Sequence, residues 1–239
     1  MPGDSNEVSW ERDVENEARL LRDLRSGRKI DSVVPAKFDF YLQMPHDLRV
    51  DRKYVSWSTL AREFHIDCAS PRRYLDAKRA LGSQAEPLVG NPSPTQVTQL
   101  LSVFGGIGQS TDVHHFCLWE GYAAVSGVSK ALDGRTVSTP VAPKAPLAEG
   151  PMSRRYFVHR GRLGDAIDVG RVAQKTAPDF WWPDNLDWFV ACDMDLPVTY
   201  IGCTQAIADQ LLDRQNPVIL PASIDDLVVS QSALRAGLS

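Results

Sequence analysis

The sequence lacks any apolar run that approaches the roughly 18–20 residues needed to cross a membrane. Residues 1–20 are acidic and have no apolar core of the kind found in signal peptides, so we expect a cytoplasmic protein without membrane attachment. Cysteine is scarce, since Cys68, Cys117, Cys192 and Cys203 are scattered and form no Cys-x-x-Cys pair. In a chain of 239 residues this pattern predicts reduced, mostly buried thiols.

Motifs of nucleotide binding and hydrolysis are also missing. The sequence has no Gly-x-Gly-x-x-Gly, no Gly-x-x-x-x-Gly-Lys, no His-Glu-x-x-His and no Gly-x-Ser-x-Gly. The net charge of −4 argues against attraction of the whole surface to nucleic acid or to an anionic membrane. We therefore predict no cofactor and no metal.

The composition, with 43% hydrophobic and 23% charged residues, is that of a globular protein with a sizeable core. Residues 9–26 have the apolar spacing of an amphipathic helix, so we assign residues 1–34 to an N-terminal helix and linker. Residues 35–239 are expected to form a single α+β domain. Within it, residues 130–153 are rich in proline and alanine and predict a flexible loop.

The segment from Trp188 to Leu212 gives the clearest pattern of secondary structure. Two apolar segments flank Leu196-Pro197, which predicts an antiparallel hairpin, and a helix follows that Thr204 can cap. Other strands and short helices alternate along the chain without a regular repeat. The predicted fold is α+β, an antiparallel sheet with short helices packed on one face, plus a peripheral N-terminal helix.

Aromatic residues are the most conspicuous candidates for a binding site. Tryptophans beside a proline turn can wall a ligand groove or cover the end of a sheet. Packing in the core or at its rim remains the alternative for each of them. The residues predicted to line a groove are Trp119, Tyr122, Trp181, Trp182 and Trp188.

Acidic and metal-binding residue types give weaker hypotheses. Asp193 and Asp195 are two residues apart and would point the same way in a strand. Together with Asp184 and Asp187 they could hold a hard cation or act as acid and base, and a solvated strand edge is the alternative. His115 and Cys117 have the same spacing and would need further ligands, such as Cys192 or Cys203, to hold zinc. Nothing in the sequence completes that ligand set.

Residues 59–81 resemble a degenerate helix-turn-helix, which gives an alternative function in DNA binding. Between residues 49 and 81, eight Lys and Arg stand against four Asp and Glu in an otherwise acidic chain. A structural helix pair is the other interpretation of this segment. The residues expected to face nucleic acid are Arg72, Arg73, Lys78 and Arg79.

Three segments carry a resemblance to other proteins. Residues 177–203 are APDFWWPDNLDWFVACDMDLPVTYIGC, residues 116–122 are FCLWEGY and residues 156–161 are YFVHRG. They resemble the motifs WWP…WFVATEID…STYVGG, F-x-x-W-x-G-[WY] and Y-x-L-F-x-G of an uncharacterised protein family of actinomycete-type bacteria. The family's glutamate is Asp193 here and its second glycine is Cys203. The resemblance implies a shared fold with no known activity, and it makes DNA binding less favoured.

From these observations we expect a non-enzymatic protein that binds a protein partner or a small ligand at the aromatic groove. The alternatives are a DNA-binding regulator, an immunity protein and a metal-dependent hydrolase.

Overall fold

The computed structural model describes residues 8–69, 73–82, 85–107, 112–122, 129–130, 136–137, 147–150, 154–213 and 218–229. Its helices are α1 (Glu15–Arg22), the short 3-10 helix η1 (Ile30–Ser32), α2 (Trp57–Phe64), α3 (Arg73–Leu81), α4 (Pro94–Ile107), α5 (Asp165–Val172) and α6 (Gln205–Leu212). Its strands are β1 (Phe40–Pro45), β2 (Leu48–Val50), β3 (Lys53–Val55), β4 (Glu86–Pro87), β5 (His114–Trp119), β6 (Ser129–Lys130), β7 (Thr136–Val137), β8 (Ala148–Glu149), β9 (Arg155–Gly161), β10 (Phe180–Pro183), β11 (Trp188–Ala191), β12 (Val198–Cys203) and β13 (Leu220–Ala222).

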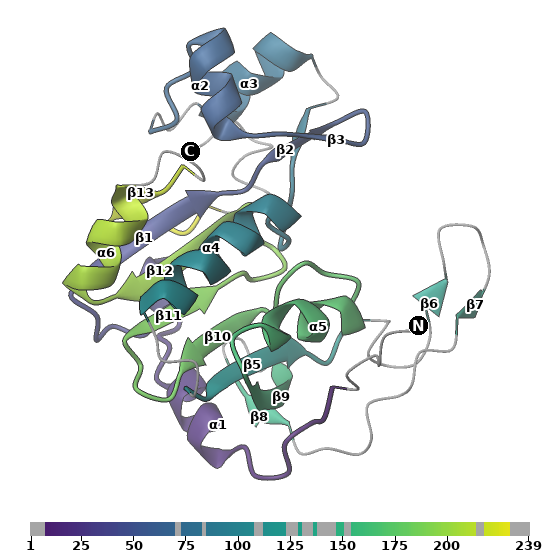
Figure 1. Cartoon of the computed structure of the whole chain (residues 1–239), viewed down its shortest axis with the longest axis vertical. Coiled ribbons are helices and arrows are strands. Elements are labelled where there is room, and N and C mark those ends of the chain that lie inside the picture. Colours follow the sequence, from purple (N-terminus) through teal and green to yellow (C-terminus); the bar gives the residue numbers. More distant parts are fainter. Residues whose placement is uncertain are drawn as a thin grey trace.

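An eight-stranded sheet forms the centre of the molecule (Figure 1). Its strand order is β13-β1-β12-β11-β10-β5-β9-β8, and every neighbouring pair runs antiparallel. The predicted hairpin is β11 with β12, which pair from Trp188 opposite Cys203 to Ala191 opposite Tyr200. The structure thus confirms the predicted α+β fold.

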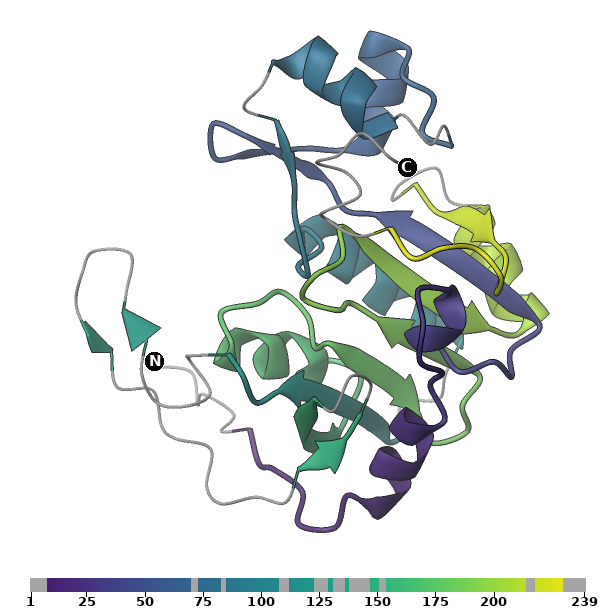
Figure 2. The ribbon, with the colours of Figure 1, turned by 180° about the vertical axis from the view of Figure 1, so that it is seen from behind.

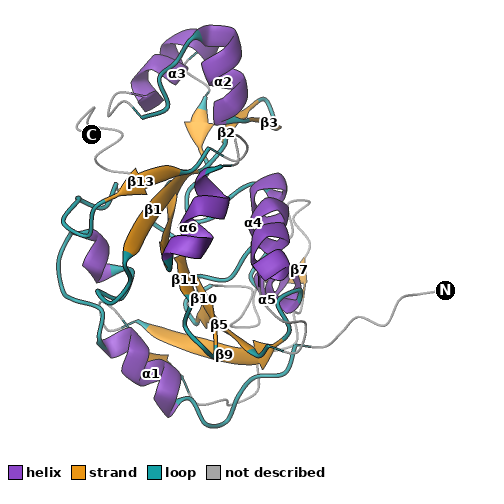
Figure 3. Cartoon of the chain, turned by 60° about the vertical axis from the view of Figure 1, so that its left-hand side comes forward, coloured by secondary structure: helices purple, strands orange, loops and turns teal. Residues whose placement is uncertain are grey.

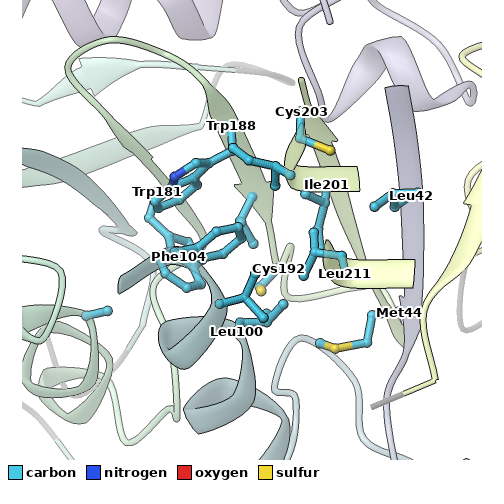
Figure 4. Close-up of a cluster of buried hydrophobic side chains, with 14 of the residues drawn as sticks. Leu42, Met44, Leu100, Phe104, Trp181, Trp188, Cys192, Ile201, Cys203 and Leu211 are labelled. Carbon is cyan, nitrogen blue, oxygen red and sulfur yellow. The ribbon is translucent and has the colours of Figure 1, made fainter. Parts of the chain in front are cut away.

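Helices α4, α5 and α6 cover one face of this sheet (Figures 1 and 3). The apolar core beneath them is drawn in Figure 4. Phe104 of α4 stacks on Trp188 with ring centroids 4.0 Å apart and meets Trp181 edge to face at 5.6 Å. Trp181 and Trp188 are therefore part of the core on this face.

The opposite face is covered by segments from the two ends of the described chain. Helix α1 and residues 28–34 lie across it, together with residues 224–229 (Figures 2 and 3). Leu21, Ile30 and Val34 are fully buried there. Both faces of the sheet are covered, so the side chains on both sides of the central strands are buried. These strands are therefore continuous apolar runs, whereas a strand with one exposed face alternates apolar and polar residues.

The N-terminal helix is shorter than the predicted 9–26, because α1 begins at Glu15 and ends at Arg22. The residues before it pass beside β9, where the Glu11 backbone N–H donates to the Val158 carbonyl at 2.8 Å. Val14 precedes the helix and provides no side-chain cap. The helix lies at the edge of the sheet near β8 and is docked on the chain's own strands.

A small lobe lies between residues 47 and 89, beside the end of β1 (Figure 1). It contains the sheet β3-β2-β4 and helices α2 and α3, packed around a separate core. Two hydrogen bonds connect this core to the main sheet. Trp57 donates to the His46 carbonyl at 2.8 Å, and the Tyr74 hydroxyl donates to the Pro197 carbonyl at 2.9 Å.

Most of the predicted loop 130–153 lies outside the described residues. Its described parts include β6 and β7, which pair with each other, and β8, which joins the edge of the main sheet. Residues 148–149 are therefore a strand where a loop was predicted, because the first residues of β9 pair with them. None of the helices in the described ranges is long and apolar enough to cross a membrane.

Candidate functional site

Polar side chains gather at one end of the main sheet, where β5 and β11 end and their antiparallel neighbours β9 and β10 begin. Four segments of the chain contribute to this group, so only the folded sheet brings its members together. We call it the Lys175 cluster, and its members are Trp119, Tyr122, Arg154, Lys175, Asp179, Asp193 and Asp195.

Lys175 is the buried centre of the cluster, with 8% of the residue exposed. Its ammonium group donates to the Asp179 carboxylate, to the Tyr122 hydroxyl oxygen at 2.8 Å and to the Cys192 carbonyl at 3.4 Å. Asp179 also accepts from the Tyr122 hydroxyl at 2.6 Å and from the Trp119 backbone N–H at 2.8 Å. A buried ion pair needs such additional hydrogen bonds to offset its desolvation, and each donor of Lys175 has an acceptor here.

This network holds two aromatic residues at the surface. Trp119 and Tyr122 are half-buried, and their rings meet edge to face with centroids 5.4 Å apart. A Cβ on Gly121 would lie 2.1 Å from the Trp119 ring, so any other residue at position 121 would displace that ring. Burial and the charge of Asp179 raise the pKa of Tyr122 far above its usual value, so its hydroxyl stays protonated.

Arg154 forms ion pairs with both Asp193 and Asp195, which are two residues apart in the sequence. Its guanidinium donates to both carboxylate oxygens of Asp193, at 2.8 and 3.1 Å, and to Asp195 at 2.6 Å. It also lies over the Trp119 ring, 5.4 Å from the centroid. Burial raises the pKa of Asp193, and the charge of Arg154 offsets only part of this effect. The two aspartates thus serve as partners of an arginine.

The five aromatic residues predicted to line a groove lie in different parts of the molecule. Trp181 and Trp188 are buried beneath α4, whereas Trp182 is buried on the opposite face. Successive residues of a strand point to opposite faces, which separates Trp181 from Trp182. Trp119 and Tyr122 remain together as the half-exposed pair of the cluster.

The residues considered for a metal site do not converge either. Cys117 lies in the core on one face of the sheet, whereas Cys192 and Cys203 lie in the core on the other face. The described part of the chain contains no group of three His, Cys, Asp or Glu side chains that could hold a metal ion. All four cysteines are buried and unpaired.

The basic residues expected to face DNA have different surroundings. Arg72 lies outside the described residues. Arg73 is buried, with its guanidinium 5.2 Å from the ring centroid of Tyr74. Lys78 is half-buried, and Arg79 is exposed and pairs with Asp76 at 2.8 Å.

Lys175, Asp179 and Arg154 are not among the site residues predicted from the sequence. The spacing of Lys175 and Asp179, four residues apart before a buried strand, was a usable signal, although burial of the pair depends on the whole sheet. Two of the segments that carry the family resemblance, 116–122 and 177–203, contribute side chains to the cluster. No family model, curated protein or solved structure matches this chain.

Proposed function

We propose that this protein acts by binding a protein partner, which contacts the rim formed by Trp119, Tyr122 and Arg154. The observation that carries the proposal is a half-exposed aromatic pair with a guanidinium over it, fixed in place by buried hydrogen bonds. Trp, Tyr and Arg are the residues most enriched in interface hot spots. Side chains that are already fixed lose little conformational entropy on binding, which favours affinity.

The chemistry of the Lys175 cluster supports a binding role over a catalytic one. A general base needs a free acceptor with a pKa near the working pH. In this cluster the oxygens of Asp179 accept from three donors, and Tyr122 is held in its protonated form. Four buried, unpaired cysteines also support our proposal that the protein works in a reducing compartment such as the cytoplasm.

Replacing Trp119 by alanine tests the proposed rim. Partners would be captured from an extract of the source organism with the purified protein, identified, purified and measured by calorimetry. We expect Trp119→Ala to weaken the affinity about 30-fold or more, as the loss of a hot spot of about 2 kcal/mol implies. A Trp119→Ala protein that folds normally by circular dichroism and binds every partner like the wild type would contradict the proposal.

The matched control for this experiment is Leu212→Ala. Leu212 is 39% exposed on α6, away from the Lys175 cluster, so its truncation removes exposed apolar surface without touching the rim. We expect Leu212→Ala to bind like the wild type.

A second candidate function is nucleic-acid binding by the small lobe, favoured by the β2–β3 hairpin. Arg49 and Tyr54 are cross-strand neighbours, and Tyr54 is 54% exposed. Arg52 and Lys53 follow at the exposed tip, where Asp51 and Arg52 both have positive φ angles, as a tight hairpin turn requires. None of these three basic side chains forms an ion pair with a described residue. Exposed cations beside an aromatic ring suit a phosphate backbone and an unstacked base.

Anisotropy of a fluorescein-labelled DNA, single- and double-stranded, measured over a salt series tests this candidate. We expect the triple variant Arg49→Ala/Arg52→Ala/Lys53→Ala to bind more weakly and to lower the salt slope by about 3 on double-stranded and about 2 on single-stranded DNA, because each phosphate contact contributes about 0.9 and about 0.7 respectively. Arg162→Ala, at an exposed arginine of the main body, is the control. Absence of binding by the wild type at low salt would eliminate the candidate.

A further inference from the structure

A buried carboxylate connects the N-terminal helix to the sheet. Glu17 of α1 is 1% exposed, and its carboxylate contacts an imidazole and a guanidinium group of neighbouring strands. Its carboxylate lies 2.6 Å from Nδ1 of His115 on β5, and it accepts from Nε of Arg160 on β9 at 2.7 Å and from Nη2 at 3.0 Å. This contact is the polar part of an otherwise apolar interface.

The other ring nitrogen of His115 faces a second carboxylate. Nε2 lies 2.5 Å from Oδ1 of Asp184, which follows β10 and is 63% exposed. The imidazole also stacks on Trp182, with centroids 5.4 Å apart and planes within 6° of parallel. Only the protonated imidazolium can donate from both nitrogens, so this geometry with two carboxylates suits the charged ring.

Helix α1 depends on this docking. It has eight residues and no side-chain cap at its N-terminus, whereas isolated helices shorter than about 12–15 residues are marginal in water. Ala18, Leu21 and Leu24 are buried against the sheet, so the helix and its apolar contacts form together.

We propose that Glu17, His115 and Asp184 form a protonation-dependent latch that holds α1 on the sheet and weakens as the pH rises. When His115 loses its proton, a neutral ring keeps one N–H for two carboxylates. One hydrogen bond is then lost, and the buried Glu17 retains only Arg160 as its cationic partner.

The direction of the pKa changes agrees with this geometry. Burial lowers the pKa of His115, but hydrogen bonds to Glu17 and Asp184 outweigh it and raise the pKa above its usual value. Burial and the charge of His115 lower the pKa of His114 beside it. Burial raises the pKa of Glu17, yet hydrogen bonds from His115 and Arg160 lower it to about 2.

The sign of the pH dependence follows from these two changes. The pKa of His115 is higher in the folded protein than in the unfolded chain, where it is about 6.5. His115 therefore stabilises the docked state fully at pH values below about 6.5. This stabilisation is lost as the pH rises through the pKa of His115 in the folded protein. The contribution of Glu17 is present above its unfolded pKa and is lost only as the pH falls towards about 2. The latch is therefore strongest in mildly acidic solution.

Hydrogen exchange of residues 15–24 over a pH series, corrected for the intrinsic exchange rate, tests the latch. The ionisation of His115 is followed in parallel by NMR of the full chain. We expect protection to fall as His115 deprotonates, by about tenfold for each unit by which the folded pKa exceeds the unfolded one. Protection that does not change through this titration would overturn the proposal.

Three variants distinguish a protonation-dependent latch from a contact that only packs α1 against the sheet. His115→Phe retains a ring against Trp182 but cannot ionise, so its protection should not depend on pH. Asp184→Asn changes a mostly exposed side chain and should move the His115 titration and the loss of protection to lower pH together. Glu15→Gln, on the exposed side of α1, should behave like the wild type. A pH dependence that persists in His115→Phe, or that does not follow the titration in Asp184→Asn, would also overturn the proposal.

Discussion

Replacing Asp179 by alanine is expected to lower the free energy of unfolding by about 3–5 kcal/mol, the cost of removing one partner from a buried ion pair. Lys175 would keep a buried ammonium group without its carboxylate, and the Trp119 backbone N–H and the Tyr122 hydroxyl would lose their acceptor. Urea unfolding followed by circular dichroism measures the change. The same variant should lose binding at the rim, because the network no longer fixes Trp119 and Tyr122.

Two further variants serve as controls for Asp179→Ala. Lys175→Met/Asp179→Ala removes both charges, so we expect it to be more stable than Asp179→Ala alone. Asp168→Ala removes an exposed carboxylate that pairs with Arg171 and should change stability by about 0.5 kcal/mol or less. A loss below about 1 kcal/mol for Asp179→Ala would contradict the central role given to this pair.

Replacing Trp181 by alanine is expected to cost about 3–5 kcal/mol, as for other large aromatic residues in a core. The ring is completely buried and contacts Phe104 and Trp188 edge to face, with centroids 5.6 and 5.3 Å apart. The shortened side chain would leave a cavity beneath α4 that the rigid sheet cannot close. Urea unfolding gives the loss, and near-ultraviolet circular dichroism reports the disturbed aromatic packing.

Trp119→Ala is the comparison for this second prediction. Trp119 is half-buried at the rim, so its truncation should cost less stability than that of Trp181. If the two variants were equally stable, the assignment of Trp181 to the core and Trp119 to the rim would be wrong. The difference also explains why binding tests should use Trp119, since loss of binding by Trp181→Ala would follow from unfolding alone.

The local elements of the fold are predictable because short-range patterns specify them. The β11–β12 hairpin follows from two apolar segments around Leu196-Pro197, and Ser56 caps α2 by accepting from the Thr59 backbone N–H at 3.2 Å. The bounds of α1 are less predictable. Val14 fits the apolar spacing of a helix but precedes α1, and the backbone N–H of Glu11 bonds to β9 instead.

The candidate site is predictable only in part. Trp119 and Tyr122 are visible in the sequence as an aromatic pair separated by a glycine. Trp181 and Trp182 are adjacent in a strand, and the alternation of side chains along a strand is enough to place them on opposite faces. The sequence does not show that both faces of the sheet are covered, because α1 and residues 224–229 reach the second face from opposite ends of the described chain.

The sequence by itself determined the class of fold, the β11–β12 hairpin and the free thiols. Tertiary structure alone decided that Lys175 and Asp179 are buried together, that Arg154 joins Asp193 to Asp195, and that Glu17 meets His115. The physical reason is that hydrogen-bonded turns, caps and side-chain periodicity act over a few residues. Burial and charge pairing depend on which distant strand ends meet, and antiparallel pairing brought those ends together only in the folded sheet.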